Sequence, residues 1–444
     1  MSCGSVSELP KVQHSKCCVV QATAGSNPAA TATPNWEGVM RARIDGRRVR
    51  SAASRARILD AAEELYATVG FHATSLRAVA REVGMSPAGV ARHYSSKDEL
   101  LADVLAQVTG SEGDTGSPDL DPAERAVRLL TSGLGAPGRA RLSTMLLGEA
   151  TSPDHPAHSF VSARLDAVTR ALTGAFGDRG VDLAAAWDGL RLMRLYVPDV
   201  DPESRFAAHL AGRPEPDGPV APPDGVAARL AVPDVADVTP IGHDIADPPP
   251  EPTTREGQIM RAAAAAIAET GYRGMSVREL AAGLDTTHSA LLYHFTSKAT
   301  LLEAVMDYRD QLVGSSWAEP VTPLDGIYNL YRRAVYNESH PDFIEIYSAL
   351  SCEASHPSHP SHSYFRRRFE MLIGFLAMEL SRLQASGQVH AGLDPVAEAQ
   401  WLGAMWDGLQ LHGLYRDIPD TSDRVLRQLN TWTTLPLPRY EPAR

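Results

Sequence analysis

The chain has 444 residues, 43% of them hydrophobic and 22% charged, and its net charge is −12. Domains usually contain about 100–200 residues, so two or three are expected. No apolar run approaches the roughly 20 residues that span a bilayer, and no secretory signal opens the chain, so we expect no membrane partner. Spread evenly, the acidity would also argue against a nucleic-acid partner. This argument depends on where the charged residues lie along the chain.

Residues 1–50 are interpreted as a disordered tail that ends in a basic arm. Residues 1–39 show no helical or strand period and hold three of the four cysteines, which excludes a disulfide scaffold in the body. Translation starting at Met40 is one interpretation of this segment, and a disordered tail is the alternative. From Arg41 to Arg57 there are seven arginines and one acid. Such an arm can lie along DNA phosphates, with a solvated tail as the alternative.

The next segment predicts three short helices. Apolar positions over Arg57–Val69 indicate an amphipathic helix that Gly70 closes. Thr74 or Ser75 is expected to cap a second helix, and Ser86 a third helix in which Pro87 takes the first position. A longer helix is expected from near Asp98. Three helices with a tight turn between the last two form a helix-turn-helix, with an ordinary three-helix bundle as the alternative.

An internal repeat covers most of the chain. With a constant offset of 201, residues 58–101 match residues 259–302 without a gap. Downstream, residues 149–160 resemble residues 353–364, and Trp187–Tyr196 resembles Trp406–Tyr415. Each copy is long enough to form a domain, so the sequence predicts a duplication. The identical residues in the first match include Ala61, Ala62, Gly70, Ser75, Arg77, Ala80, His93, Ser96, Lys97, Leu100 and Leu101.

A proline-rich segment separates the two copies. Residues 213–252 contain eleven prolines, eight acids and two arginines, so half of the net acidity lies there. Such a composition cannot build a core and predicts an extended linker. The expected division is a tail and basic arm 1–50, a helix-turn-helix domain 51–100, a helical domain 101–210, the linker 211–253, a second helix-turn-helix domain 254–302, a second helical domain 303–435 and a tail 436–444.

Both copies resemble the DNA-binding head of the TetR family of bacterial transcriptional regulators. The resemblance rests on the bends at Gly70-Phe71 and Gly271-Tyr272, the T-S-x-R-x-[VL]-A run at Thr74–Ala80, the short helices ending at His93-Tyr94 and His294-Phe295, and the Ser-Lys-x-x-Leu-Leu segments that follow. The downstream His-Pro and Trp-Asp-Gly-Leu stretches resemble the regulatory domain of that family. The chain therefore resembles two complete regulators in tandem.

This resemblance implies an all-α fold in which each head precedes a helical regulatory domain. The family's unit is a homodimer held by a four-helix bundle, so we expect an intramolecular pseudo-dimer with Trp187–Tyr196 facing Trp406–Tyr415. Helices over Asp201–Leu210 and Ser422–Leu429 would complete the bundle, and a homodimer of chains is the alternative. The implied partners are a double-stranded DNA operator and an unidentified small-molecule effector that relieves repression. The implied location is the bacterial cytoplasm, at the nucleoid.

Equivalent residues in the two heads are expected to contact phosphates. Lys97 and Lys298 each start a helix, where an ammonium group and backbone N–H groups suit a phosphate, with a solvated lysine as the alternative. Arg77 and Arg278 lie beside the caps and are expected to contact phosphate or to form a surface salt bridge. The expected contacts at the second helix are Thr74, Ser75, Arg77, Ser276 and Arg278.

Base contacts are expected from the third helix of each head. The candidates are Pro87, Ala88, Gly89, Arg92 and His93 in the first copy and His288, Ser289, Ala290, Tyr293 and His294 in the second. Arg92 can grip the O6 and N7 atoms of guanine, and Ser289 can reach a base edge. His93 and His294 are also open to a structural role. Because the two sets differ, we expect an operator with two unlike half-sites about one helical turn apart.

Two departures from the family pattern leave a second function class open. The usual Thr-Leu-Tyr-Tyr run of the third helix is broken in both copies, and Asp285 stands where the turn glycine is expected. The alternative function is therefore that of a dimerisation or interaction protein whose second head has weak or no DNA affinity. The basic arm and the paired lysines favour the DNA-binding regulator.

The remaining patterns predict no catalytic or metal chemistry. Gly133–Gly138 matches G-x-G-x-x-G, but no strand precedes it, and it is interpreted as a loop. Cys352, His356, His359 and His362 have loop-like spacing, so no metal and no cofactor is expected. No metalloprotease, P-loop or nucleophile-elbow motif occurs, so we do not expect an enzyme. An effector pocket is expected from residues that could equally be core: Phe343, Tyr347, Trp401, Met405 and Trp406.

Overall fold

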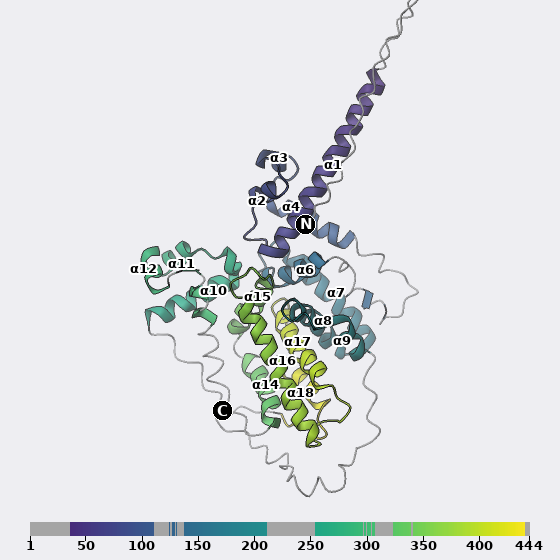
Figure 1. Cartoon of the computed structure of the whole chain (residues 1–444), viewed down its shortest axis with the longest axis vertical. Helices are drawn as coiled ribbons and strands as arrows, with labels where there is room; N and C mark the ends of the chain where they lie inside the picture. Colours follow the sequence, from purple (N-terminus) through teal and green to yellow (C-terminus); the bar gives the residue numbers. More distant parts are fainter. Residues whose placement is uncertain are drawn as a thin grey trace, which may run out of the picture. The chain divides into compact units, whose positions relative to one another are not determined.

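The computed structural model (Figure 1) describes residues 36–110, 137–210, 254–306, 323–338 and 341–439, apart from residues 296, 299 and 303, and also residues 124, 127, 128 and 130. By its internal contacts the chain divides into two units, Met1–Ala53 and Ser54–Arg444. The described part of the first unit is the start of helix α1 (Trp36–Val69). The finer division into heads and regulatory domains stays a prediction.

Helices are the only extended elements among the described residues, with one isolated bridge between Val389 and Thr433. This confirms the all-α fold class. Half one contains α2 (Leu76–Glu82), α3 (Pro87–Ala91), α4 (Lys97–Gly110), α6 (Pro137–Glu149), α7 (His158–Phe176), α8 (Arg179–Tyr196) and α9 (Pro202–Leu210). Half two contains α10 (Arg255–Gly274), α11 (Val277–Gly283), α12 (His288–His294), α14 (Pro323–Glu338), α15 (Pro341–Glu353), α16 (His362–Ala385), α17 (Pro395–Gly413) and α18 (Thr421–Asn430).

The N-terminal boundary of α1 differs from the sequence prediction. Residues 36–50 are helical, although they were expected to be a disordered tail and arm. The segment contains five arginines, which are strong helix formers, and no proline. The helix ends as expected, because Gly70 takes a φ of +85° that only glycine adopts readily.

Head one, from the end of α1 through α4, has the predicted helix-turn-helix. The side chain of Ser75 accepts the N–H of Ala78 at the start of α2, and that of Ser86 accepts the N–H of Gly89 at the start of α3. Pro87 takes the first position of α3, where its missing N–H costs nothing. Between the two helices Gly84 has a φ of +68°. The local chemistry of serine, proline and glycine thus produced the expected turn.

Head two, formed by α10 to α12, repeats this arrangement with two differences. Ser276 and Thr287 cap α11 and α12. The turn residue Asp285 has a φ of +48°, so a residue with a side chain occupies the left-handed conformation that Gly84 takes in head one. That conformation costs about 1 kcal/mol in a residue other than glycine. Gly271 lies inside α10, so the bend expected there is wrong.

The regulatory halves pack through α8 and α17, the most extensive helix pair in the unit Ser54–Arg444 (Figure 1). Two glycines allow the backbones to touch. A Cβ atom on Gly189 would lie 1.8 Å from the carbonyl oxygen of Ala404, and one on Gly408 would lie 1.8 Å from that of Ala185. Gly189 lies 219 residues before its counterpart Gly408, and Ala185 lies 219 residues before its counterpart Ala404, so the two contacts are the same contact with the halves exchanged. The crossing therefore has pseudo-two-fold symmetry, as the predicted pseudo-dimer requires.

Helices α9 and α18 complete the bundle, as expected. From α9, Arg205 donates to Gln400 of α17 at 2.8 Å, and the ring of His209 stacks on Trp401 at 3.6 Å. From α18, Arg424 donates to Asp182 of α8 at 2.8 Å. Each half thus contributes two helices to the interface. Within the parts of the chain that the structure describes, no helix is long and apolar enough to cross a bilayer.

Candidate nucleic-acid interface

The third helix of head two presents its predicted residues to solvent. His288, Ser289 and Ala290 at the start of α12 are exposed. Tyr293 is 86% exposed, the largest exposed fraction among the large hydrophobic side chains of the described residues. His294 is also exposed, and its Nδ1 atom lies 3.3 Å from a carboxylate oxygen of Glu256. An aromatic ring left in water on a recognition helix is available for contact with a DNA backbone or base.

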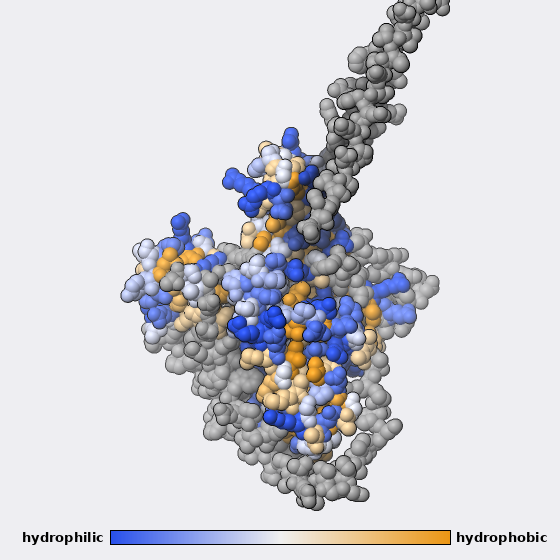
Figure 2. Space-filling view, in the orientation of Figure 1, coloured by the Kyte–Doolittle hydropathy of each residue, from blue (hydrophilic) through white to orange (hydrophobic). Residues whose placement is uncertain are grey.

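The third helix of head one presents fewer candidates. Pro87, Ala88 and Arg92 are exposed, and His93 is half-buried. Gly89 is buried, which corrects the expectation that it reads a base. A Cβ atom there would lie 3.2 Å from the Oγ atom of Ser86, because the N-terminal turn of α3 closes over the capping serine. Figure 2 shows hydrophilic residues gathered over the α2–α3 region of this head.

Thr74 is not available to DNA, which is a second correction. Its side chain is buried, with 2% of the residue exposed, and its hydroxyl donates to the backbone oxygen of Gly70 at 2.7 Å. The residue that both caps α2 and remains exposed is Ser75. Thr74 therefore stabilises the corner between α1 and α2, and the polar contact falls to its neighbour.

The two equivalent arginines of the second helices are placed as the phosphate prediction requires. Arg77 and Arg278 are exposed and lie in the first turns of α2 and α11. Ser75 is exposed and Ser276 half-buried at the adjacent caps. Helix N-termini carry outward N–H groups and a positive dipole end, so an arginine beside them makes a site suited to phosphate. The phosphate contacts themselves stay predictions.

Lys97 has a structural contact that the sequence did not reveal. Its ammonium group donates to the backbone oxygens of Phe71 at 2.9 Å and His72 at 3.3 Å, and lies 4.1 Å from the centre of the Phe71 ring. Burial lowers the pKa of Lys97. The phosphate contact predicted for it is untested, but its side chain already ties α4 to the α1–α2 corner. Its equivalent Lys298 is half-buried at the corresponding position.

Glu149 joins head one to its regulatory domain, a role that sequence reasoning missed. This half-buried residue ends α6, and its carboxylate accepts the N–H groups of Phe71 at 2.7 Å and His72 at 3.4 Å. The side chain fills the space that a Cβ atom on Gly70 would need. Burial raises the pKa of Glu149 to about 8. The repeated Glu-Ala pair at Glu149 and Glu353 was the only sequence signal for this position.

We expect the Glu149 linkage to make stability fall as pH rises. The pKa of Glu149 rises from an ordinary 4.5 to about 8 on folding, so the folded state binds more protons between these values. Replacing Glu149 with Gln removes this titration while keeping an oxygen that accepts N–H groups. Urea unfolding at pH 5 and pH 8 should show a smaller loss of stability for Glu149→Gln than for the wild type. The exposed Glu64→Gln serves as the control, and an unchanged pH dependence in Glu149→Gln would refute the assignment.

Two arginines of the basic arm are engaged within head one. Arg55 forms an ion pair with Asp103 and lies 5.0 Å from the centre of the Tyr94 ring. Arg57 donates to the backbone oxygen of Val83 at 2.5 Å. These side chains brace α1 against the rest of the head. The other five arginines of the arm have side chains outside the described residues.

The histidines after α6 and α15 hold turns. In the first copy, Nδ1 of His155 accepts the N–H of Ala157 at 3.1 Å. In the second copy, Nδ1 of His359 accepts the N–H of Ser361 at 3.2 Å, and Nδ1 of His362 lies 2.9 Å from the backbone oxygen of Ala354. In the described parts of the chain, no three metal-ligating side chains converge. The repeated His-Pro pattern thus corresponds to turn structure.

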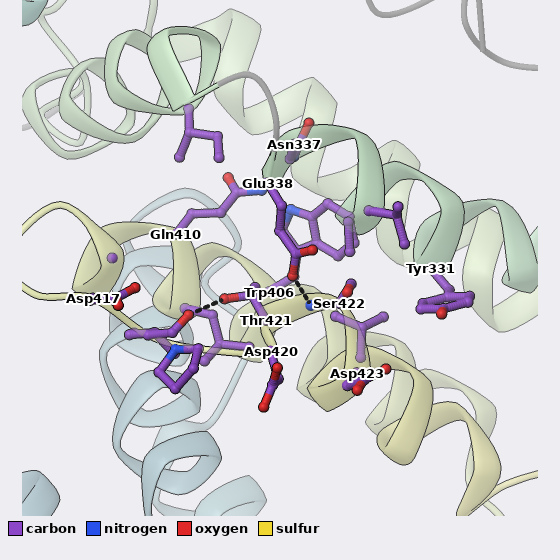
Figure 3. Close-up of a pocket in the computed structure, with 18 of the residues that line it drawn as sticks. Tyr331, Asn337, Glu338, Trp406, Gln410, Asp417, Asp420, Thr421, Ser422 and Asp423 are labelled. Atoms are coloured by element: carbon purple, nitrogen blue, oxygen red, sulfur yellow. Dashed lines mark hydrogen bonds between the residues drawn. The ribbon is translucent and has the colours of Figure 1, made fainter. Parts of the chain in front are cut away.

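A pocket of about 670 Å³ opens in half two between α14, α17 and α18 (Figure 3). It is not lined by Tyr347, Trp401 or Met405, which are buried, so the pocket expected from them stays a prediction. The side chain of Phe343 lies outside the described residues. Trp406 does line the pocket. Other lining residues include Tyr331, Glu338, Gln410, Asp420 and Val425.

The pocket depends on a difference between the two copies. In half one the indole of Trp187 is 1% exposed, and the ring of Phe206 packs edge-on against it at 5.2 Å. The residue equivalent to Phe206 in half two is Val425, which is smaller and lines the pocket beside Trp406. At the rim, Glu338 accepts the N–H of Ser422 at 2.7 Å, a bond that Figure 3 marks with a dashed line.

Each head, in which two short helices follow a longer one and the last is exposed, is a helix-turn-helix module. Residues 58–104 and 259–305 match the family described as bacterial regulatory proteins, tetR family, and residues 359–435 match the C-terminal domain of BetI-type transcriptional repressors. Both heads and the last helices of the second half thus match the TetR family, and the two head matches are consistent with a tandem duplication of a TetR-type unit.

Two curated relatives resemble parts of the chain. The HTH-type transcriptional regulator UidR of Escherichia coli is 31% identical over 64 residues, which is 14% of this chain and 33% of that protein. The HTH-type transcriptional repressor KstR2 of Mycobacterium tuberculosis is 29% identical over 124 residues, which is 26% of this chain and 59% of that protein. The chain thus spans between about a third and three-fifths of the length of these relatives.

Proposed function

We propose that this protein is a sequence-specific DNA-binding transcriptional regulator that acts as a repressor. The observation that carries the proposal is the presence of two helix-turn-helix heads, each with an exposed third helix and an exposed arginine at the second helix. Matches to transcriptional regulators over both heads support it. The acidity of the chain does not oppose this function, since half of it falls in the linker.

The operator we propose has two unlike half-sites. Head one offers Arg92 to a base edge, whereas head two offers Ser289 and Tyr293. A bidentate arginine–guanine contact contributes about 1–3 kcal/mol to base discrimination, while a serine and an aromatic ring prefer other contacts. One chain therefore recognises two different sequences in a fixed order.

Binding to the DNA upstream of the gene for this protein tests both statements. Arg92→Ala should weaken binding by about 5–150-fold through one half-site, the equivalent of 1–3 kcal/mol, and Tyr293→Ala should act through the other. Arg366→Ala, which removes an exposed arginine from α16, is the control for charge. Fluorescence anisotropy on operators with each half-site scrambled assigns the heads. Equal effects of both substitutions on both half-sites would refute two unlike half-sites.

The same experiment decides the alternative function. An interaction protein with an inactive second head would bind through one half-site only, and Tyr293→Ala would then have no effect on affinity. Asp285 and the broken aromatic run favour that alternative, but the exposed α12 surface and the preserved cap and arginine favour a second working head.

We propose further that the pocket beside Trp406 receives the small-molecule effector. It is the described cavity that adjoins both α17 and α18, so a ligand there contacts the helices that join the two halves. Val425→Phe copies the residue of half one and should fill the pocket. A neutral apolar dye such as Nile red should gain fluorescence with the wild type and lose most of that gain with Val425→Phe. Equal dye binding by both proteins would place the effector elsewhere.

A further inference from the structure

Several contacts between the two halves occur twice, once in each direction. The hydroxyl of Tyr196 donates to the backbone oxygen of Ser351, and the hydroxyl of Tyr415 donates to that of Leu147 at 2.8 Å. Tyr196 and Tyr415 are equivalent in the repeat, and so are Leu147 and Ser351. Where equivalent residues differ, the symmetry is broken. These positions show whether each half packs better against the other half or against a second copy of itself.

The first difference lies where α6 meets α15. Gly148 and Cys352 are equivalent residues, and they face each other. A Cβ atom on Gly148 would lie 2.4 Å from the Cβ atom of Cys352 and 2.9 Å from the backbone oxygen of Ala349. The space between the helices thus holds one side chain. Two glycines would leave it empty, and two cysteines would not fit.

The second difference lies along the crossing of α8 and α17. His412 binds the buried carboxylate of Asp188, with 2.9 Å between Nε2 and the oxygen, whereas the residue equivalent to His412 is Met193. The Cε atom of Met193 lies 3.3 Å from the position that a Cβ atom on Gly403 would take. The residue equivalent to Gly403 in half one is Ala184, which has that Cβ atom. Met193 thus packs against Gly403, and His412 binds Asp188.

Each like pairing would lose one of these fits. If half one paired with a second half one, Asp188 would lie against Met193 and lose the histidine that is its closest hydrogen-bond partner, and the loss of a partner by a buried carboxylate is costly. In that pairing Met193 would also press on Ala184. If half two paired with a second half two, two Cys352 side chains would compete for the space of one.

We propose that the surface of each half has diverged to bind the other half and to reject a second copy of itself, so that the chain closes on itself as a one-chain pseudo-dimer. The partner of the α6–α8 surface is the α15–α17 surface of the same chain. The inference rests on the packing of the two halves, and it does not depend on the proposed binding of DNA. The assembly is then one chain with one copy of each head, and not a homodimer of two identical subunits.

The matching of Gly148 with Cys352 is tested by a double-mutant cycle in the full chain. Gly148→Ala alone should lower the thermal midpoint by about 2–10 °C, because the added methyl group has no space. In the Cys352→Gly background the same substitution should raise the midpoint, because the methyl group then fills the space of the thiol side chain. A loss of similar size in both backgrounds would overturn the matching, since the two positions would then not face each other.

The pairing of the two halves within one chain, here called closure, is tested on the wild-type chain. The result therefore does not depend on whether a variant folds. Light scattering should give the mass of one chain, 47.8 kDa, over the accessible concentration range. Two full-length chains with different affinity tags, produced in the same cells, should not be captured together. A mass of two chains, or capture of one tagged chain by the other, would overturn closure.

Discussion

Gly189→Ala should separate the two halves and lower the free energy of unfolding by about 3 kcal/mol, the upper end of what overpacking costs. The added methyl group would lie 1.8 Å from the carbonyl oxygen of Ala404. That neighbour is backbone inside a helix, so it cannot rotate away, and α8 and α17 have to move apart. Gly408→Ala, the symmetric substitution against Ala185, should have an effect of similar size. Urea unfolding measures both.

A third glycine supplies the matched control. Gly374 lies exposed in α16, and a Cβ atom there would have no neighbour within 4 Å. Gly374→Ala should therefore raise stability by about 0.5–1 kcal/mol, because alanine is the better helix former. If Gly189→Ala proved as harmless as Gly374→Ala, the close approach of α8 and α17 would be wrong.

His412→Leu should lower the free energy of unfolding by about 3 kcal/mol, the lower end of what breaking a buried ion pair costs, because it removes the closest partner of the Asp188 carboxylate and leaves it with Arg191 at 3.5 Å. Burial by itself would raise the pKa of Asp188, but the hydrogen bond and ion pair with His412, together with the charges of Arg191 and Arg164, outweigh burial and hold the pKa below the ordinary value. An acid with a lowered pKa stabilises the fold above its ordinary pKa, and this contribution is lost as pH falls through the folded value. The cost of the variant should therefore be large at pH 7.

The same variant should lose less stability in acid. As pH falls toward the ordinary pKa of an aspartate, Asp188 in His412→Leu takes up a proton and the buried charge disappears. Thermal unfolding at pH 7 and pH 4 measures the change, and the half-buried His390→Leu outside the bundle is the control. A cost that is the same at both values would show that His412 acts by packing and not by holding the charge of Asp188.

Local structure could be predicted from the sequence because helix caps and turns depend on neighbouring residues. The pairing of the two halves could be predicted from the repeat. Ser75, Ser86 and Pro87 cap or open their helices as their side chains dictate. The repeat predicted that Trp187–Tyr196 packs against Trp406–Tyr415, because two copies of one surface that pair symmetrically must use the same residues. The bend expected at Gly271 failed, because its motif is compatible with helix as well as with a turn.

The site residues were predicted less well because exposure is not a local property. Thr74 and Gly89 carry the residue types of a DNA contact, yet the corner between α1 and α2 and the first turn of α3 bury them. Lys97 has a charge suited to phosphate, yet its ammonium group binds backbone oxygens of the preceding corner. Each of these outcomes depends on what the neighbouring helix covers.

The sequence by itself determined the class of fold, the duplication and the division of charge between arm and linker, because these depend on periodicity, identity and composition. Only the tertiary structure decided which predicted residues face solvent, where the pocket lies and how unlike residues meet between the halves. The physical reason is that burial, close approach and pairing depend on how helices pack against one another, and at the contacts between the halves the packed segments lie about 200 residues apart. Nothing in the sequence marks Gly148 and Cys352 as partners, and only the structure shows that they face each other.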